Sequence, residues 1–182
     1  LPGRGSSYSL GVERKGGTAM AMRYPDAKRY STFEEGLEYQ DFVAEVLRRE
    51  LGIVITNYAS KKYQFNIGEN RQGIEIKLDN RILDTGNVSI EVGEKSRREL
   101  PDYTPSGILR NDNSWLYIQG NYRIMFVFSL GLLKLLYNSG RYRVDELPTI
   151  RRFLLKLEDA KKYAALTVHE DTLSRYDSLR VG

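Results

Sequence analysis

One stretch in the middle of the chain alternates apolar and charged residues with the period of a β-strand. Residues 73–79 read GIEIKLD, so the isoleucine and leucine side chains face one way while Glu75, Lys77 and Asp79 face the other. This pattern predicts a strand with one apolar face and one charged face.

A second stretch, residues 87–96, alternates in the same way and reads NVSIEVGEKS. Its charged face carries Glu91 and Lys95, with Gly93 leaving a gap between them. The residues DTGN at 84–87 form a turn signal, so we expect the two strands to be neighbours in an antiparallel pair.

A segment before these strands has the features of a helix. Thr32 and Glu35 form a T-x-x-E capping box, and Gly52 is placed to end the helix. The other expected elements are a short strand at 53–56, a long polar loop at 97–114, strands at 115–120 and 122–129, a helix at 130–140, and a strand followed by a helix within 149–170. This order predicts an α/β domain with a mixed sheet.

Residues 1–22 are rich in glycine, serine and charge and show neither period, so we expect a disordered tail or tag remnant there and one domain over 23–182. No apolar run is long enough to cross a membrane, which predicts a protein with no membrane partner that works in the cytoplasm.

Composition narrows the chemistry. The chain has no cysteine and one histidine, His169, which excludes disulfides, cysteine-based zinc sites, thiol nucleophiles and multi-histidine metal sites. Catalysis then depends on carboxylates, lysines and hydroxyls, and any metal would be a hard ion held by oxygen. The net charge of +4 fits a polyanionic partner.

The charged faces of the two strands have two interpretations. They are either a solvated surface or a catalytic site, because carboxylates about 5 Å apart on paired strands repel each other unless a cation lies between them. A hard divalent ion on Glu75, Asp79 and Glu91, with a lysine near the developing charge, is what hydrolysis of a phosphodiester requires.

The sequence GIEIKLD, a turn and SIEVGEKS, preceded by an acidic helix, resembles the PD-(D/E)xK nuclease superfamily, and more narrowly its uncharacterised phage and prophage members. The resemblance implies a restriction-endonuclease-like three-layer fold, a mixed central sheet flanked by helices, with Mg²⁺ or Mn²⁺ as cofactor. If the chain is viral, it would work in the cytoplasm of the host cell. Glu75 matches the first acidic position of the family and Glu91 the second.

The family lysine departs from the pattern, because Gly93 occupies its position and Lys95 or Lys77 must supply the ammonium. Strand parity favours Lys95, unless a β-bulge at Gly93 turns it away. In a competing register, Glu75-Ile76-Lys77 is itself the E-x-K triplet and Glu69 the upstream acid. We rank this register second because the separation is tight for two strands.

Two further features complete the prediction. On the helix, Gln40 matches the family glutamate and could orient a water. Arg97, Arg98 and Arg110 could bind phosphates of a nucleic acid, expected to be DNA. The alternative is a decayed nuclease fold that binds nucleic acid or serves in assembly; the sequence leaves a homodimer open.

Overall fold

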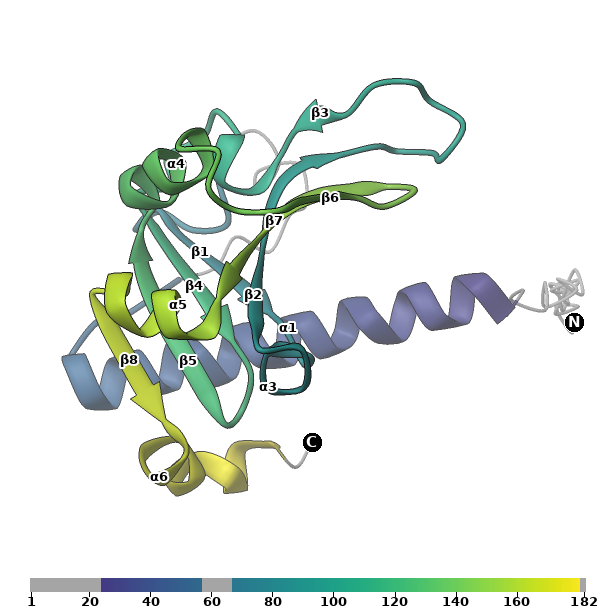
Figure 1. Ribbon diagram of the computed structural model, residues 1–182. Coiled ribbons are helices and arrows are strands. Elements are labelled where there is room, and N and C mark those ends of the chain that lie inside the picture. Colours follow the sequence, from purple (N-terminus) through teal and green to yellow (C-terminus); the bar gives the residue numbers. More distant parts are fainter. Residues whose placement is uncertain (1–23, 57–66, 181–182) are drawn as a thin grey trace, which may run out of the picture.

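The computed structural model of the chain describes residues 24–56 and 67–180, which form an α/β arrangement of one long helix and two four-stranded sheets (Figure 1). Sheet 1 has the strand order β1-β4-β5-β8, and sheet 2 the order β3-β2-β7-β6. The strands of sheet 1 are β1 (Ile74–Leu78), β4 (Leu116–Gly120), β5 (Ile124–Ser129) and β8 (Leu166–His169). Those of sheet 2 are β2 (Asn87–Glu94), β3 (Thr104–Pro105), β6 (Val144–Glu146) and β7 (Ile150–Lys156).

The helices are α1 (Tyr24–Leu51), α3 (Ile82–Thr85), α4 (Leu130–Asn138), α5 (Leu157–Tyr163) and α6 (Glu170–Leu173), with two 3₁₀ turns, η1 (Gly107–Leu109) and η2 (Ser174–Arg180). Sheet 1 is mixed, because β1 runs parallel to β4 while β4, β5 and β8 pair antiparallel. Sheet 2 is antiparallel throughout.

Helix α1 covers one face of sheet 1. Its apolar side chains recur at helical spacing, and Tyr39, Val43 and Leu47 are buried against Ile76 and Ile118 of the sheet. The strands are therefore apolar on the face toward α1, and the charged side chains of β1 point the other way.

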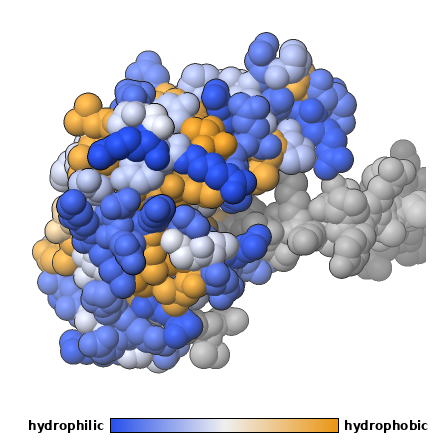
Figure 2. All heavy atoms as spheres, viewed as in Figure 1, coloured by the Kyte–Doolittle hydropathy of each residue, from blue (hydrophilic) through white to orange (hydrophobic). Residues whose placement is uncertain are grey.

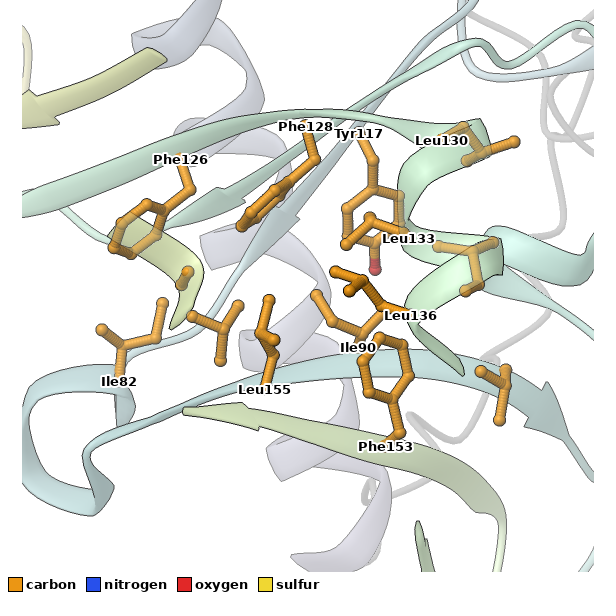
Figure 3. Close-up of a cluster of buried hydrophobic side chains, with 14 of the residues drawn as sticks. Ile82, Ile90, Tyr117, Phe126, Phe128, Leu130, Leu133, Leu136, Phe153 and Leu155 are labelled. Carbon is orange, nitrogen blue, oxygen red and sulfur yellow. The ribbon is translucent and has the colours of Figure 1, made fainter. Parts of the chain in front are cut away.

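The second apolar cluster lies between the two sheets (Figure 3). Phe126 and Phe128 of sheet 1 face Ile90 and Phe153 of sheet 2, and helix α4 closes one end of the cluster. Sheet 1 is thus buried on both faces, which places the charged face of β1 inside the molecule.

Several predicted elements are confirmed: the strands β1, β2, β4, β5 and β7, the helices α4 and α5, and the end of α1 at Leu51. Gly52 follows α1 with a φ of 67°, a conformation that glycine adopts without strain. The start of the helix is wrong, because α1 begins at Tyr24 rather than at Thr32. Residues 53–56 form no strand, although Ile53 and Ile55 pack against the cluster beneath α1.

The predicted antiparallel pair is also wrong. β1 pairs with β4, while β2 pairs with β3 and β7 in the other sheet. The reason lies in the connection: Ile82 of helix α3 is fully buried in the cluster between the sheets, so the chain crosses from one sheet to the other instead of turning back.

The α/β class is confirmed, but two sheets stand where one central sheet was expected. On the face in Figure 2, hydrophobic residues form patches interrupted by hydrophilic ones. Among the helices of the described ranges, none combines the length and the apolar character needed to cross a bilayer. The segment 1–22, expected to be disordered, lies outside the described residues.

Candidate functional site

The charged face of β1 is buried rather than solvated. The Glu75 residue is 0% exposed, and its register partner across the parallel pair is Tyr117 of β4, also 0% exposed. Lys77, two residues further on the same face, retains 28% exposure of its side chain. The charged groups are therefore reached from solvent at Lys77.

Lys77 binds two carboxylates. Its Nζ lies 3.0 Å from Oε1 of Glu75 and 3.5 Å from Oε1 of Glu69. The other oxygen of Glu69 accepts the Ile76 backbone N–H at 2.9 Å and lies 3.5 Å from the Gln40 amide Nε2 of α1. The structure thus brings together Glu69, Glu75, Lys77 and Gln40, which we call the Lys77 cluster.

This grouping is the competing register of the sequence analysis, and a tight turn makes it feasible. Asn70 binds the backbone of Ile74 twice, donating to its carbonyl at 2.6 Å and accepting its N–H at 2.9 Å. The Gly73 N–H closes the turn on the Asn70 carbonyl, with Gly73 at a φ of 68°. Glu69 therefore reaches β1 from a turn that folds back on it, and no second strand is needed.

Burial and charge act together in the Lys77 cluster. Burial raises the pKa of Glu69, and the charge of Lys77 only partly offsets this effect. Burial alone would lower the pKa of Lys77, but Glu75 and Glu69 outweigh it, so the pKa lies well above 10.5. Burial, followed by the charge of Glu75, raises the pKa of Tyr117 well above 10.0. Lys77 is therefore a permanent cation here.

Two polar groups, one in the Lys77 cluster and one opposite it on β4, lack a hydrogen-bond partner among the described residues. They are Oε2 of Glu75 and the hydroxyl of Tyr117, both fully buried. Buried polar atoms are rarely left unpaired, so such a pair suggests a site that completes its contacts with a further group.

Glu91 belongs to sheet 2, whereas Glu75 belongs to sheet 1. The two residues therefore do not lie on neighbouring strands of one sheet, contrary to the prediction. Its Oε1 accepts a hydrogen bond from Ser106 Oγ at 2.5 Å, and its charge contributes to raising the pKa values of Lys77 and Tyr117. Glu91 thus acts on the Lys77 cluster from the facing sheet.

Lys95 is turned away from the Lys77 cluster by an irregularity of β2 at Gly93, the condition named in the sequence analysis. The register of β2 against β7 shifts between Glu91 and Gly93, as in a β-bulge. Beyond it, the Lys95 ammonium lies 4.1 Å from the centroid of the Tyr103 ring. Of the two candidate lysines, Lys77 is the one beside the carboxylates.

Asp79, predicted as a metal ligand, follows β1 and is hydrogen-bonded to residues of both sheets. Its Oδ2 accepts the Ser89 N–H and the Gln119 amide, both at 3.2 Å. It also lines a small polar pocket with Arg81, Thr85, Asn87, Ser89, Arg152 and Leu154. Asp79 therefore joins the two sheets beside the Lys77 cluster.

The three arginines lie on the segment between β2 and β4. Arg97 and Arg98 are exposed on the connection from β2 to β3, which projects from the body as an arm (Figure 1). Arg110 ends the 3₁₀ turn η1 and is half-buried. The expected loop at 97–114 contains this arm and β3.

Within residues 24–56 and 67–180, no three acidic or histidine side chains are grouped so that they could hold a metal ion. The predicted set of Glu75, Asp79 and Glu91 is accordingly not assembled as one site. The sequence did not identify Ser106 or Tyr117 as part of the site. Each reaches the site only through a contact with another segment, Ser106 with Glu91 and Tyr117 with Glu75, and no local pattern predicts such contacts.

Comparison of the chain with known protein families, curated proteins and solved structures finds no match in any of the three.

Proposed function

We propose that the protein is a metal-dependent nuclease that hydrolyses phosphodiester bonds of nucleic acid, with DNA as the expected substrate, and that the Lys77 cluster is its active site. The observation that carries the proposal is the burial of Glu75 beside Lys77 and Glu69, with one carboxylate oxygen left without a hydrogen bond. Buried charged groups cost stability, and such costs are concentrated at functional sites.

The residues of the Lys77 cluster fit a hard divalent ion. Mg²⁺ is commonly bound by one or two carboxylates together with waters and substrate phosphate, so Glu75 and Glu69 suffice as protein ligands. Oε2 of Glu75 has no hydrogen-bond partner among the described residues, so this oxygen is available as a metal ligand. When bound, the ion would polarise the scissile phosphate and lower the pKa of a bound water.

The other residues of the proposed active site then have separate roles. The permanent charge of Lys77, on the solvent side of the cluster, stabilises negative charge that develops on the phosphate. Gln40 fixes the orientation of the Glu69 carboxylate through its amide. Glu91, held by Ser106, adds negative charge from the facing sheet.

A second function is favoured by a specific observation. Lys77 already neutralises two carboxylates, and the helix contributes the neutral Gln40 rather than a third acid. These features support a nuclease-like protein that binds nucleic acid or serves in assembly without cleaving it.

A cleavage assay distinguishes the two functions. Single-stranded, duplex and branched DNA and RNA are incubated with the protein in Mg²⁺, Mn²⁺ or EDTA, beside Glu75→Gln, Glu91→Ala and, as a matched control, the exposed Glu158→Gln. A nuclease cleaves at least one substrate with metal, loses cleavage in Glu75→Gln and keeps it in Glu158→Gln. Binding without cleavage under all conditions supports the second function.

A further inference from the structure

Trp115 is an exposed aromatic residue immediately before β4. It retains 59% of its surface, although tryptophan usually buries most of its area. Its Nε1 donates a hydrogen bond to the Gln72 carbonyl at 2.7 Å, so the one polar group of the ring is already paired. A ligand of this ring would contact its π-face rather than its N–H.

Trp115 is also held in place through its backbone. The Trp115 N–H donates to the Gly73 carbonyl, and the Trp115 carbonyl accepts the Leu130 N–H, both at 2.9 Å. A Cβ added to Gly73 would come within 2.8 Å of Cδ1 of the indole, which shows that the ring lies directly against this backbone. Binding to a ring fixed in this way costs little conformational entropy.

Trp115 lies next to the Lys77 cluster along the sheet. Tyr117, the register partner of the buried Glu75, follows Trp115 by two residues, and Gln119, the register partner of the accessible Lys77, follows it by four, a separation of about 13 Å along a strand. One extended strand of nucleic acid could therefore contact both Trp115 and the Lys77 cluster.

The surroundings of Trp115 favour a nucleobase over an apolar protein surface. Residues 111–114 read NDNS, and Arg71 and Gln72 lie on the neighbouring turn, so most of the chain around the ring is polar, with the exposed Ile67 beyond Asn113 as an apolar exception. Interfaces between proteins place aromatic residues in an apolar central patch, whereas single-stranded nucleic acid stacks on aromatic rings beside positive charge, which the exposed Arg71 supplies here.

We propose that Trp115 stacks with an unpaired base and so directs single-stranded nucleic acid to the Lys77 cluster. The proposal rests on the proposed function, because it names the class of substrate for that site. Every base has a π-face, so this contact selects unpaired bases rather than a particular sequence.

The chain has a single tryptophan and 13 tyrosines, so fluorescence excited at the red edge of the absorption band, where tyrosine does not absorb, reports on Trp115 alone. The wild-type protein in EDTA is titrated with a single-stranded DNA, the corresponding RNA, a duplex and a single strand with abasic sites. We expect strong quenching by the single strands, weak quenching by the duplex and none by the abasic strand.

Binding of a labelled single strand by variants completes the test. Trp115→Ala should weaken binding about tenfold, and Trp115→Phe less because it keeps an aromatic ring. Leu135→Ala removes another exposed side chain, one on α4, and should leave binding unchanged. Circular dichroism and thermal melting establish that each variant is folded.

The outcomes separate this inference from the proposed function. Equal binding by Trp115→Ala and wild type, equal quenching by abasic and intact strands, or no binding of nucleic acid overturns the stacking role. If metal-dependent cleavage persists in that case, the nuclease proposal stands without it. Loss of binding in Trp115→Ala, together with no cleavage by the wild type, supports stacking in a protein that only binds.

Discussion

The Lys77 ammonium lies 3.0 Å from the carboxylate of Glu75, a residue of the same strand that is completely buried. Residues two apart on a strand share a face, so this ion pair is local in sequence. The second carboxylate, that of Glu69, does not belong to the strand. A turn brings it to the same ammonium. One cation thus serves two carboxylates inside the protein, and the first predictions concern this balance.

Removal of the cation should be costly. Lys77→Met leaves two buried carboxylates without their partner, and we expect the free energy of unfolding to fall by about 2 to 4 kcal/mol, a range that allows for the partial exposure of Lys77. Denaturant unfolding measures the loss, and cleavage should disappear with it. Lys95→Ala is the control, since its ammonium lies over Tyr103, and it should change both quantities little. Equal, small effects in the two variants would contradict the role of Lys77.

Metal should stabilise the folded protein through Glu75. A thermal-shift titration with Mn²⁺ should raise the melting temperature of the wild type, because an ion that binds only the folded state stabilises it. The shift should be lost in Glu75→Gln and reduced in Glu69→Gln. It should persist in Glu158→Gln, which changes an exposed glutamate. A flat response in the wild type would exclude the metal site.

The raised pKa of Glu69 predicts a pH dependence with a definite sign. In the folded state Glu69 keeps its proton to a higher pH than the ordinary value of 4.5, so folding binds a proton in that window. The free energy of unfolding therefore decreases as the pH rises from about 4.5 toward the raised value. Glu69→Gln lacks this titration, and its stability relative to the wild type should increase over the same range. Denaturant unfolding between pH 4 and pH 8 gives the difference, and a constant difference would show that the pKa is not raised.

Asp79 should prove structural. Asp79→Ala removes the acceptor of the Ser89 N–H and of the Gln119 amide, and we expect a loss of about 1 to 3 kcal/mol in unfolding free energy. Asp79→Asn keeps one oxygen acceptor and should lose less. Both should retain the Mn²⁺-induced thermal shift, whereas loss of that shift in Asp79→Asn would restore Asp79 as a metal ligand.

The faces of β1 could be predicted from the sequence because the alternation of side chains is a property of the strand itself. Glu75 and Lys77 were correctly placed opposite Ile74 and Ile76 for this reason. The partner of the strand could not be predicted in the same way. The short connection to β2 is compatible with a hairpin, and only the burial of Ile82 between the sheets directs the chain elsewhere.

The candidate site shows the same division. The E-x-K triplet was visible in the sequence, whereas the position of Glu69 depends on the two hydrogen bonds between Asn70 and Ile74. The bulge at Gly93 could be named as a condition but not decided, because it depends on the pairing of β2 with β7. Local patterns thus identified the residue types, whereas the turn at Asn70 and the pairing of β2 with β7 determined which of them meet.

The hydrogen bonds of Asp79 and Gln119 have a consequence for how the protein could change over time. Gln119 of sheet 1 donates to both Asp79 and the Ser89 carbonyl of sheet 2, and Asp79 accepts the Ser89 N–H. These contacts fix the two sheets against each other next to the buried charges. The projecting connection between β2 and β3 lies outside this junction, so substitutions there can alter what the protein touches while the spacing of the charges is preserved.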